Sequence, residues 1–287
     1  MELSIILINY NTKTLTEQAI DSIIKTVERT DFEIIVVDNS SQEEQKLSLE
    51  HERIHVLRDV QNHGFGHACN LGVQHSSGEY LLFLNSDTVM AENTIDESFA
   101  FLQQDCSIGA LGVRMLRPDG SLDHGCKRGF PTPMASLYYF SGLDRRCPNS
   151  HKYGAYRQTF LEEDAVADVD SVSGAFLMIS RTVFDKVDGF DQDFFMYGED
   201  LDLCYRIKQQ GYRVVYYGKV SFLHLHGQSG LVRSEKVIGY FYDAMNLFYD
   251  KHYQNKYNAF TGFLVKMAIS CKRHLAIRKS RKVLEDG

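Results

Sequence analysis

Short, unbroken apolar runs that each end in polar residues are the feature of this sequence that most constrains its fold. The runs in the N-terminal third are LSIILINY (3–10), EIIVVDNS (33–40), IHVLRD (54–59) and YLLFLNSD (80–87). Helix-like segments separate them, one from Leu15 to about Glu28 and one after a glycine-rich turn. Strands that are buried on both faces and alternate with helices usually form a parallel sheet. The pattern therefore predicts an α/β fold with a single doubly wound, mostly parallel sheet flanked by helices.

Polar residues gather where these predicted strands end. They are Asn9, Tyr10 and Asn11 after the first run, Asp38 and Asn39 after the second, and Asn85, Ser86 and Asp87 after the fourth. In a doubly wound sheet, ligands bind in the crevice outside the carboxyl ends of the strands. We therefore expect these strand ends to line a nucleotide-binding crevice.

The length and composition suit one large α/β domain with a helical extension. The 287 residues approach the size at which a single core stops growing, and 44% hydrophobic with 24% charged residues is ordinary for a globular protein. The net charge of −7 argues against a protein that coats nucleic acid. The six cysteines form no C-x-x-C pair, which indicates reduced thiols rather than a zinc site or a disulfide framework. Without a signal peptide or an apolar run of about 18 to 20 residues, the expected location is cytoplasmic.

The pattern divides the chain into residues 1–108, 109–230 and 231–287. From 109 to 168 it loosens, which predicts irregular structure or a hairpin beside an acceptor cleft. Regular structure returns at SVSGAFLMISR (171–181), a strand entering a helix, followed by the strands YRVVYYG (212–218) and KVSFLHLHG (219–227). Helices are predicted from about Ser234 to Tyr253 and from Phe260 onward, so 231–287 form a C-terminal helical extension.

The strand ending in Asn85-Ser86-Asp87 is a candidate cation site. Oxygen ligands at a strand end hold a hard divalent cation such as Mg²⁺ or Mn²⁺, which bridges the phosphates of a nucleotide. An Asn-Ser-Asp turn is also ordinary turn chemistry. The second polar strand end, Asp38-Asn39, favours the functional interpretation, because a carboxylate beside an amide accepts hydrogen bonds from a base N–H or ribose hydroxyls.

The loop NHGFGHACNLG (62–72) lies between those two strand ends in the sequence. Its Gly64 and Gly66 allow a ligand to approach the backbone closely. The Gly-x-Gly resembles a dinucleotide fingerprint, but Cys69 stands at the third glycine position, which disfavours a Rossmann dehydrogenase.

The acid-rich segment GFDQDFFMYGEDLDLCYRIKQQG (189–211) leads into a predicted helix. One acid at a helix start is expected as a cap, but Glu199, Asp200 and Asp202 together exceed that need. A carboxylate held there, facing a cleft, would serve as the general base that deprotonates an acceptor hydroxyl. Further on, His224 and His226 share one face of a strand. Either completes the cation site begun by Asp87, unless both are structural.

Together these motifs resemble the inverting glycosyltransferase family 2, which has the GT-A fold, and within it the rhamnosyltransferase-like branch. The resemblance covers about residues 2–250. SIILINYNT looks like the opening strand and loop, EIIVVDNSS like the nucleoside-binding strand, and NHGFGHACNLG like the Asn-Gly loop that follows. NSD is similar to the metal-binding D-x-D, and SGAFLMISR with GFDQDFFMYGEDLDLCYRI resembles the acceptor and catalytic-base segment.

The resemblance implies a role for each matched residue. Asp200 would be the catalytic base, and Asp87 and His224 would bind Mg or Mn, the histidine through its H-x-x-G-x-S spacing. Because Asn85 replaces the first acid of D-x-D, only Asp87 supplies charge to the cation. The implied nucleotide-sugar contacts are Asn9, Asn11, Asp38, Asn39, Asn62, Gly64, Phe65, Asn70, Asn85, Ser86 and Asp87. The residues expected to contact the acceptor or support the site are Gly174, Glu199, Asp202 and His226.

The implied reaction moves a sugar, with rhamnose as the first expectation, from a dTDP- or UDP-linked donor to a hydroxyl group. The acceptor would be a saccharide or lipid-linked saccharide of a growing cell-surface polysaccharide or glycolipid, and no nucleic acid is involved. The 1–108 half would bind the nucleotide sugar and the 109–230 half the acceptor. Two alternatives remain, a catalytically silent nucleotide-sugar binding module and a nucleotidyltransferase. The loop NYNTKTL lacks the glycine-rich, basic character that the nucleotidyltransferase normally presents there.

The C-terminal tail differs from the rest of the chain in charge. Residues 261–287 hold seven Lys or Arg and two acids, and apolar residues recur at helical spacing from Phe260 to Cys271. A basic amphipathic helix lies on an anionic membrane surface, which suits a lipid-carried acceptor and a peripheral place at the inner face of the cell membrane. Packing on the domain, or on a second copy in a homodimer, is the alternative.

Overall fold

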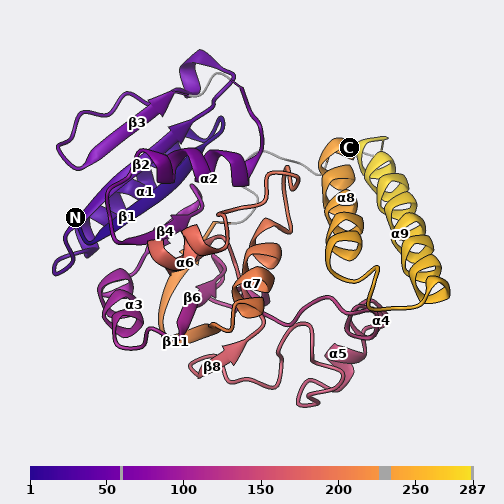
Figure 1. The fold of residues 1–287 in the computed structure, drawn as a ribbon. Helices are drawn as coiled ribbons and strands as arrows, with labels where there is room; N and C mark the ends of the chain where they lie inside the picture. The colour runs from indigo at the N-terminus through magenta and orange to yellow at the C-terminus, as the bar shows by residue number, and fades with distance from the viewer. Residues whose placement is uncertain (59–60, 226–233, 286–287) are drawn as a thin grey trace.

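The computed structural model describes residues 1–58, 61–225 and 234–285, the side chains only as far as 281. A twisted sheet forms the body of the protein, helices cover its faces, and the last two helices stand as a pair at one side (Figure 1). The predicted α/β fold with a mostly parallel sheet is confirmed.

The large sheet contains nine strands within the described residues. Their order is β3 (Ile54–Arg58), β2 (Phe32–Asp38), β1 (Leu3–Asn9), β4 (Tyr80–Leu84), β10 (Phe176–Ser180), β6 (Ile108–Leu116), β11 (Arg213–His224) and β5 (Thr88–Met90), with β8 (Val166–Val169) also paired to β11. The strands β1, β2, β3, β4, β6 and β11 share one direction, and β5, β8 and β10 oppose it. A small antiparallel pair joins β7 (Lys127–Arg128) to β9 (Ser171–Val172).

The apolar runs became strands because both of their faces are covered. All seven residues of β2 are buried, as are six of the seven in β1. On one face, α1 (Lys13–Thr26) turns the stripe Thr16, Ala19, Ile20 and Ile23 inward. The parallel register sets Asn9 beside Asp38, so the polar strand ends meet at one edge of the sheet.

The remaining helices of the body follow the strands. They are α2 (Phe65–Gln74), α3 (Thr94–Gln103), α4 (Pro133–Ser141), α5 (Leu143–Arg146), α6 (Arg181–Lys186) and α7 (Glu199–Gln209), with single 3₁₀ turns at Glu43–Gln45 and His124–Cys126. The helix α2 lies close to the sheet because Gly72 has no side chain: a Cβ there would lie 2.7 Å from Cγ2 of Ile6.

Two expectations from the sequence need correction. Residues 109–168 do contain a hairpin turn, closed by the antiparallel bridge between Leu116 and Leu122, but they are more regular than expected, because β6 runs through the middle of the large sheet and α4 and α5 follow it. The two strands predicted on either side of Gly218 are one strand, β11. Tyr217 pairs with Val113 while Ser221 pairs with Arg114, so a bulge absorbs the residues between them.

The C-terminal extension consists of α8 (Glu235–His252) and α9 (Ala259–Glu285), which lie side by side, with α7 between α8 and the sheet (Figure 1). Leu201 and Tyr205 of α7 pack with Phe248 of α8. Ile269 of α9 packs with Ile238 and Tyr242 of α8. Within the described ranges, no helix combines the length and the hydropathy that a bilayer crossing requires.

Several bases of the tail form ion pairs with α8. Lys266, Arg273 and Arg281 lie 2.7, 2.6 and 2.6 Å from Asp250, Asp243 and Glu235. Phe260, Phe263 and Met267 of α9 remain exposed. The helix therefore packs on the protein through one face and leaves an apolar face outward.

A candidate active site at the strand ends

Asp87 and His224 are brought together by the pairing of β5 with β11. Asp87 directly precedes β5, whose Thr88 lies opposite His224, and Nε2 of His224 is 3.0 Å from Oδ1 of Asp87. Both residues are buried, 7% and 4% exposed, and the Asn85 amide lies 3.3 Å from the same imidazole nitrogen. These side chains are 137 residues apart in the sequence, and the antiparallel pairing makes them neighbours.

This pair fits one part of a divalent cation site. Mg²⁺ and Mn²⁺ take one or two protein carboxylates and complete their coordination with substrate phosphates and water, and imidazole suits Mn²⁺. No cluster of three or more His, Cys, Asp or Glu with the arrangement of a metal site occurs in the described part of the chain. Asp87 and His224 would therefore supply two ligands and leave the others to the nucleotide. The remaining predicted histidine, His226, lies outside the described residues.

Asp200 is the second residue of α7, and its carboxylate is held from three directions. Oδ2 accepts hydrogen bonds from the backbone N–H of Gly174 at 2.9 Å and from the guanidinium of Arg128 at 2.6 Å. Oδ1 accepts from the N–H of Leu201 at 2.7 Å. These contacts fix the position and orientation of the carboxylate, which a general base requires. The sequence analysis missed Arg128, because a lone arginine in a segment expected to be irregular carried no sign of its position.

A short segment connects Asp200 with the cation pair. The N–H of Gly174 binds Asp200, and the carbonyl of the next residue, Ala175, accepts from the N–H of Asn85 at 3.3 Å. Phe65 belongs to the same group, since a Cβ on Gly174 would lie 3.7 Å from its ring and 3.5 Å from Cβ of Asp200. The residues expected to bind the donor phosphates and to act as base therefore lie at the same edge of the sheet.

Gly64 is required by its surroundings rather than by turn chemistry alone. Its φ is +103°, and a Cβ there would lie 2.4 Å from the carbonyl oxygen of Phe195. The same carbonyl accepts from the N–H of Phe65 at 3.0 Å, and Oδ1 of Asn62 accepts from the N–H of Gly64 at 3.0 Å. The loop is thus fixed against the segment that leads into α7.

The side chains of Asn9 and Asp38 form hydrogen bonds with neighbouring protein groups. Asp38 accepts from Nδ2 of Asn9 at 3.0 Å, from the N–H of Leu47 at 2.7 Å and from Arg58. Asn11, with a φ of +56°, accepts from the N–H of Ser41 at 3.1 Å. Oδ1 of Asn39 differs from these groups, because it is buried and has no hydrogen-bond partner among the described residues. It is the open acceptor of this strand end.

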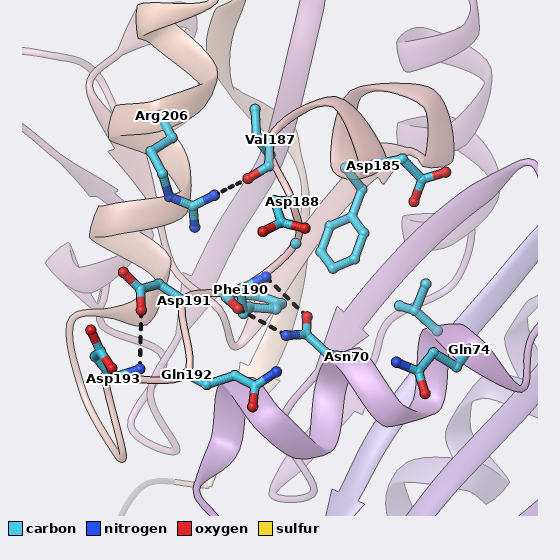
Figure 2. A pocket seen from close by; sticks show the side chains of 13 residues that line it. Asn70, Gln74, Asp185, Val187, Asp188, Phe190, Asp191, Gln192, Asp193 and Arg206 are labelled. Atoms are coloured by element: carbon cyan, nitrogen blue, oxygen red, sulfur yellow. Dashed lines mark hydrogen bonds between the residues drawn. The ribbon is translucent and has the colours of Figure 1, made fainter.

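Two further predicted residues have structural contacts. Ser86 lies 3.1 Å from the hydroxyl of Thr12. Asn70 uses both ends of its amide on the backbone of Phe190, donating at 2.8 Å and accepting at 2.9 Å (Figure 2). The cavity drawn there has a volume of about 770 Å³ and four aspartates in its wall, and Asn70 alone of the predicted residues lines it.

Glu199 and Asp202 flank Asp200 and differ from each other. Asp202 binds Arg206 at 2.7 Å and Nε2 of His252 at 2.7 Å, which ties α7 to α8. Glu199 is buried, and its Oε2 has no hydrogen-bond partner within the described residues. Burial, together with the neighbouring Asp200 carboxylate, raises the pKa of Glu199 to about 8. Glu199 is therefore largely protonated at neutral pH.

The fold and this arrangement place the protein among the glycosyltransferases of GT-A type. The mannosyltransferase PcManGT from Pyrobaculum calidifontis, solved with GDP-Man and Mn²⁺, superposes with a TM-score of 0.59 at 15% identity, over 99% of this chain and 74% of that one. The chain belongs to glycosyl transferase family 2, whose model matches residues 4–166. A model described as the N-terminal domain of galactosyltransferase matches residues 162–227.

Curated relatives extend the similarity along the chain. The low-salt glycan biosynthesis hexosyltransferase Agl10 of Haloferax volcanii is 28% identical over 74% of this chain and 64% of its own length. The O-antigen biosynthesis protein RfbC of Myxococcus xanthus is 26% identical over 73% of this chain, which spans only 16% of that protein. The N-acetylglucosaminyl-diphospho-decaprenol L-rhamnosyltransferase of Mycobacterium tuberculosis is 24% identical over 97% of this chain and 94% of its own length. This chain thus covers less than two thirds of the first two relatives.

Proposed function

We propose that this glycosyltransferase moves a sugar from a nucleoside-diphosphate donor to an acceptor hydroxyl with inversion at the anomeric carbon. The observation that carries the proposal is the link through residues 174 and 175, which joins the Asp200 carboxylate to the strand end of Asn85 and Asp87. Donor phosphates held at one end of this link would bring the anomeric carbon close to the base at the other end.

The donor side would be formed by Asp87, His224 and Asn39. Asp87 and His224 would hold Mg²⁺ or Mn²⁺, which when bound neutralises the charge of the departing diphosphate. The open Oδ1 of Asn39 suits the ring N–H that uracil and thymine share, which favours a UDP- or dTDP-linked sugar. Rhamnose is the favoured sugar because the relative from Mycobacterium tuberculosis is a rhamnosyltransferase.

The acceptor side would be centred on Asp200. Its carboxylate, held in place by Arg128 and the N–H of Gly174, takes the proton from the acceptor hydroxyl as that oxygen attacks the anomeric carbon. The diphosphate leaves from the opposite face, so a single displacement inverts the centre and no enzymic nucleophile is needed. The acceptor would be a saccharide or a lipid-linked saccharide.

Thermal unfolding with and without ligand tests the donor half of this proposal. A nucleoside diphosphate or nucleotide sugar with Mn²⁺ should raise the melting temperature, since a ligand that binds only the folded form stabilises it. The variant Asp87→Ala should lose the Mn²⁺-dependent part of that shift. Asp21→Ala, an exposed change on α1, is the control and should keep it. Calorimetry that finds equal Mn²⁺-dependent affinity in Asp87→Ala and the wild type would refute the assignment.

The apolar face of α9 supports peripheral contact with a membrane. Phe260 and Phe263 are 70% and 63% exposed on a helix that carries basic residues, and such a surface binds anionic bilayers. The wild type should float with phosphatidylglycerol liposomes, and the double variant Phe260→Ser/Phe263→Ser should not. Equal flotation of the two proteins contradicts the contact. A change from dimer to monomer in the variant, without wild-type flotation, would instead support the homodimer.

A further inference from the structure

A second cavity, of about 480 Å³, is lined in large part by arginines, among them the Arg128 that binds Asp200. Its walls are formed by Arg117, Arg128, Arg145 and Arg157, by Tyr139 and Tyr156, and by residues 123–125, which include Asp123, the one acid among the lining residues that the structure describes. Four guanidinium groups around one cavity stand out in a chain whose net charge is −7. We call this cavity the arginine pocket.

Much of the hydrogen-bonding capacity of the arginine pocket is unused. Arg117 and Arg157 approach carboxylates only at 3.6 and 3.5 Å, those of Asp123 and Asp144. Arg145 has neither a carboxylate nor a hydrogen-bond partner among the described residues. Each guanidinium carries five N–H donors in a planar fork that matches the oxygens of a phosphate or carboxylate.

Two buried atoms in the wall point to the same conclusion. Nε of Arg128 and Nδ1 of His124 are buried and have no hydrogen-bond partner in the described part of the structure. Burial lowers the pKa of His124, and the nearby Arg157, Lys127 and Arg117 lower it further while Asp123 opposes the shift. Buried polar groups are normally satisfied, so the open N–H of Arg128, in a wall with four guanidinium groups, favours an anionic ligand.

The position of the pocket assigns its ligand to the acceptor side. Arg128 lines the pocket and also binds Asp200 at 2.6 Å, so a group in the pocket is one side chain away from the base. None of the strand ends that form the donor crevice contributes to the wall. A donor diphosphate on Asp87 and His224 would therefore occupy a different place.

We propose that the arginine pocket binds a phosphate or diphosphate group of the acceptor and thereby sets the acceptor hydroxyl against Asp200. This inference rests on the proposed transferase function and adds the chemical class of the acceptor, a phosphorylated saccharide. Phosphate is favoured over a single carboxylate because several separate guanidinium groups, one of them without an acid partner, match more than one negative charge.

Arg145 and Arg146 provide a matched pair for the test. They are neighbours in α5 and both exposed, but only Arg145 lines the pocket. Calorimetric titration with inorganic pyrophosphate, in buffer with a chelator so that no divalent cation is present, isolates the pocket from the cation site. Arg145→Gln should weaken pyrophosphate binding about tenfold or more, as expected for lost hydrogen bonds to a charged group. Arg146→Gln should leave it unchanged.

A second titration separates this proposal from the proposed function. The wild type and both variants receive UDP or dTDP with Mn²⁺, and equal affinity in all three proteins is expected. If Arg145→Gln weakens nucleotide binding as much as pyrophosphate binding, the pocket belongs to the donor and the proposal is wrong. Undetectable pyrophosphate binding to the wild type, or equal loss in both variants, also overturns it. Failure of the nucleotide to bind the wild type instead counts against the transferase proposal.

Discussion

Residues 1–108 and the rest of the sheet-bearing body differ in how completely their buried polar groups are hydrogen-bonded. Among the described residues of this body, Oδ1 of Asn39 is the one buried side-chain atom in residues 1–108 that lacks a hydrogen-bond partner, and the others lie after residue 108. Before residue 108, the polar strand ends bind one another, as Asn9 and Asp38 do. After it, open atoms include Nε of Arg128 and Oε2 of Glu199.

Two buried glutamates make the contrast concrete. Glu33, in β2, accepts from the Ser4 hydroxyl at 2.7 Å and from the N–H of Ser77 at 2.6 Å. Burial alone would raise the pKa of Glu33, but these hydrogen bonds outweigh it and lower the pKa. For Glu199, burial and the nearby Asp200 raise the pKa to about 8. The first glutamate completes a network, whereas the second is held in its neutral form.

This difference in hydrogen bonding suggests different roles for the two parts. A satisfied network holds the strand ends of residues 1–108 to the loops that follow them, where we propose that the donor binds. Unsatisfied and perturbed groups cost stability and persist mainly where a ligand or a reaction uses them. The part after residue 108 therefore holds the groups we expect to meet the acceptor.

Replacing the base should have the largest effect. In Asp200→Asn the amide oxygen still accepts from Arg128, but the side chain no longer takes a proton, so kcat should fall about a thousandfold or more while donor affinity is retained. Asp193→Asn, an exposed change in the same acid-rich segment, is the control and should leave kcat unchanged. Initial rates at saturating donor measure both. Substantial turnover in Asp200→Asn would show that Asp200 is not the general base. The proposed difference in function between the two parts would then lose its main support.

Much of the fold could be predicted from the sequence because the apolar runs of β1, β2 and β4 are local signals. The strand β6 was missed, although it is as buried, because its run IGALGVRML contains two glycines and an arginine and precedes a region rich in turns. Gly112 lies against Val172, where a Cβ would be 2.5 Å from the Cβ of that valine. The glycine is therefore needed for close packing between distant segments, which the local sequence pattern does not indicate.

The candidate site was predictable only where residues follow a strand or start a helix. Asp87 and Asp200 satisfy that condition, strand alternation singled out His224 and His226, and the resemblance to family 2 chose His224. Arg128 and the arginine pocket do not satisfy it. Their residues are spread from Arg117 to Arg157, through a turn, a two-residue strand and two short helices, and only the tertiary structure gathers them.

The last effect we predict is on stability rather than on activity, and it tests the comparison of the two glutamates. Between the ordinary value of 4.5 and about 8, folded Glu199 keeps a proton that the unfolded chain has released. Unfolding then releases protons, so this group's stabilising contribution is complete below about pH 4.5 and is lost as pH rises towards 8, by at most about 1.4 kcal/mol per pH unit.

Glu199→Gln keeps the neutral shape and cannot ionise, so its free energy of unfolding should fall less steeply between pH 5 and 8 than that of the wild type. Guanidinium denaturation at several pH values measures the two slopes. Glu33→Gln is the matched comparison from the other part: the pKa of Glu33 is lowered, so its contribution is lost only as pH falls below its ordinary value of 4.5, and the slope above pH 5 should stay that of the wild type. If the free energy of unfolding falls equally steeply with pH in Glu199→Gln and the wild type, Glu199 is ionised at neutral pH. The two glutamates would then not differ in charge.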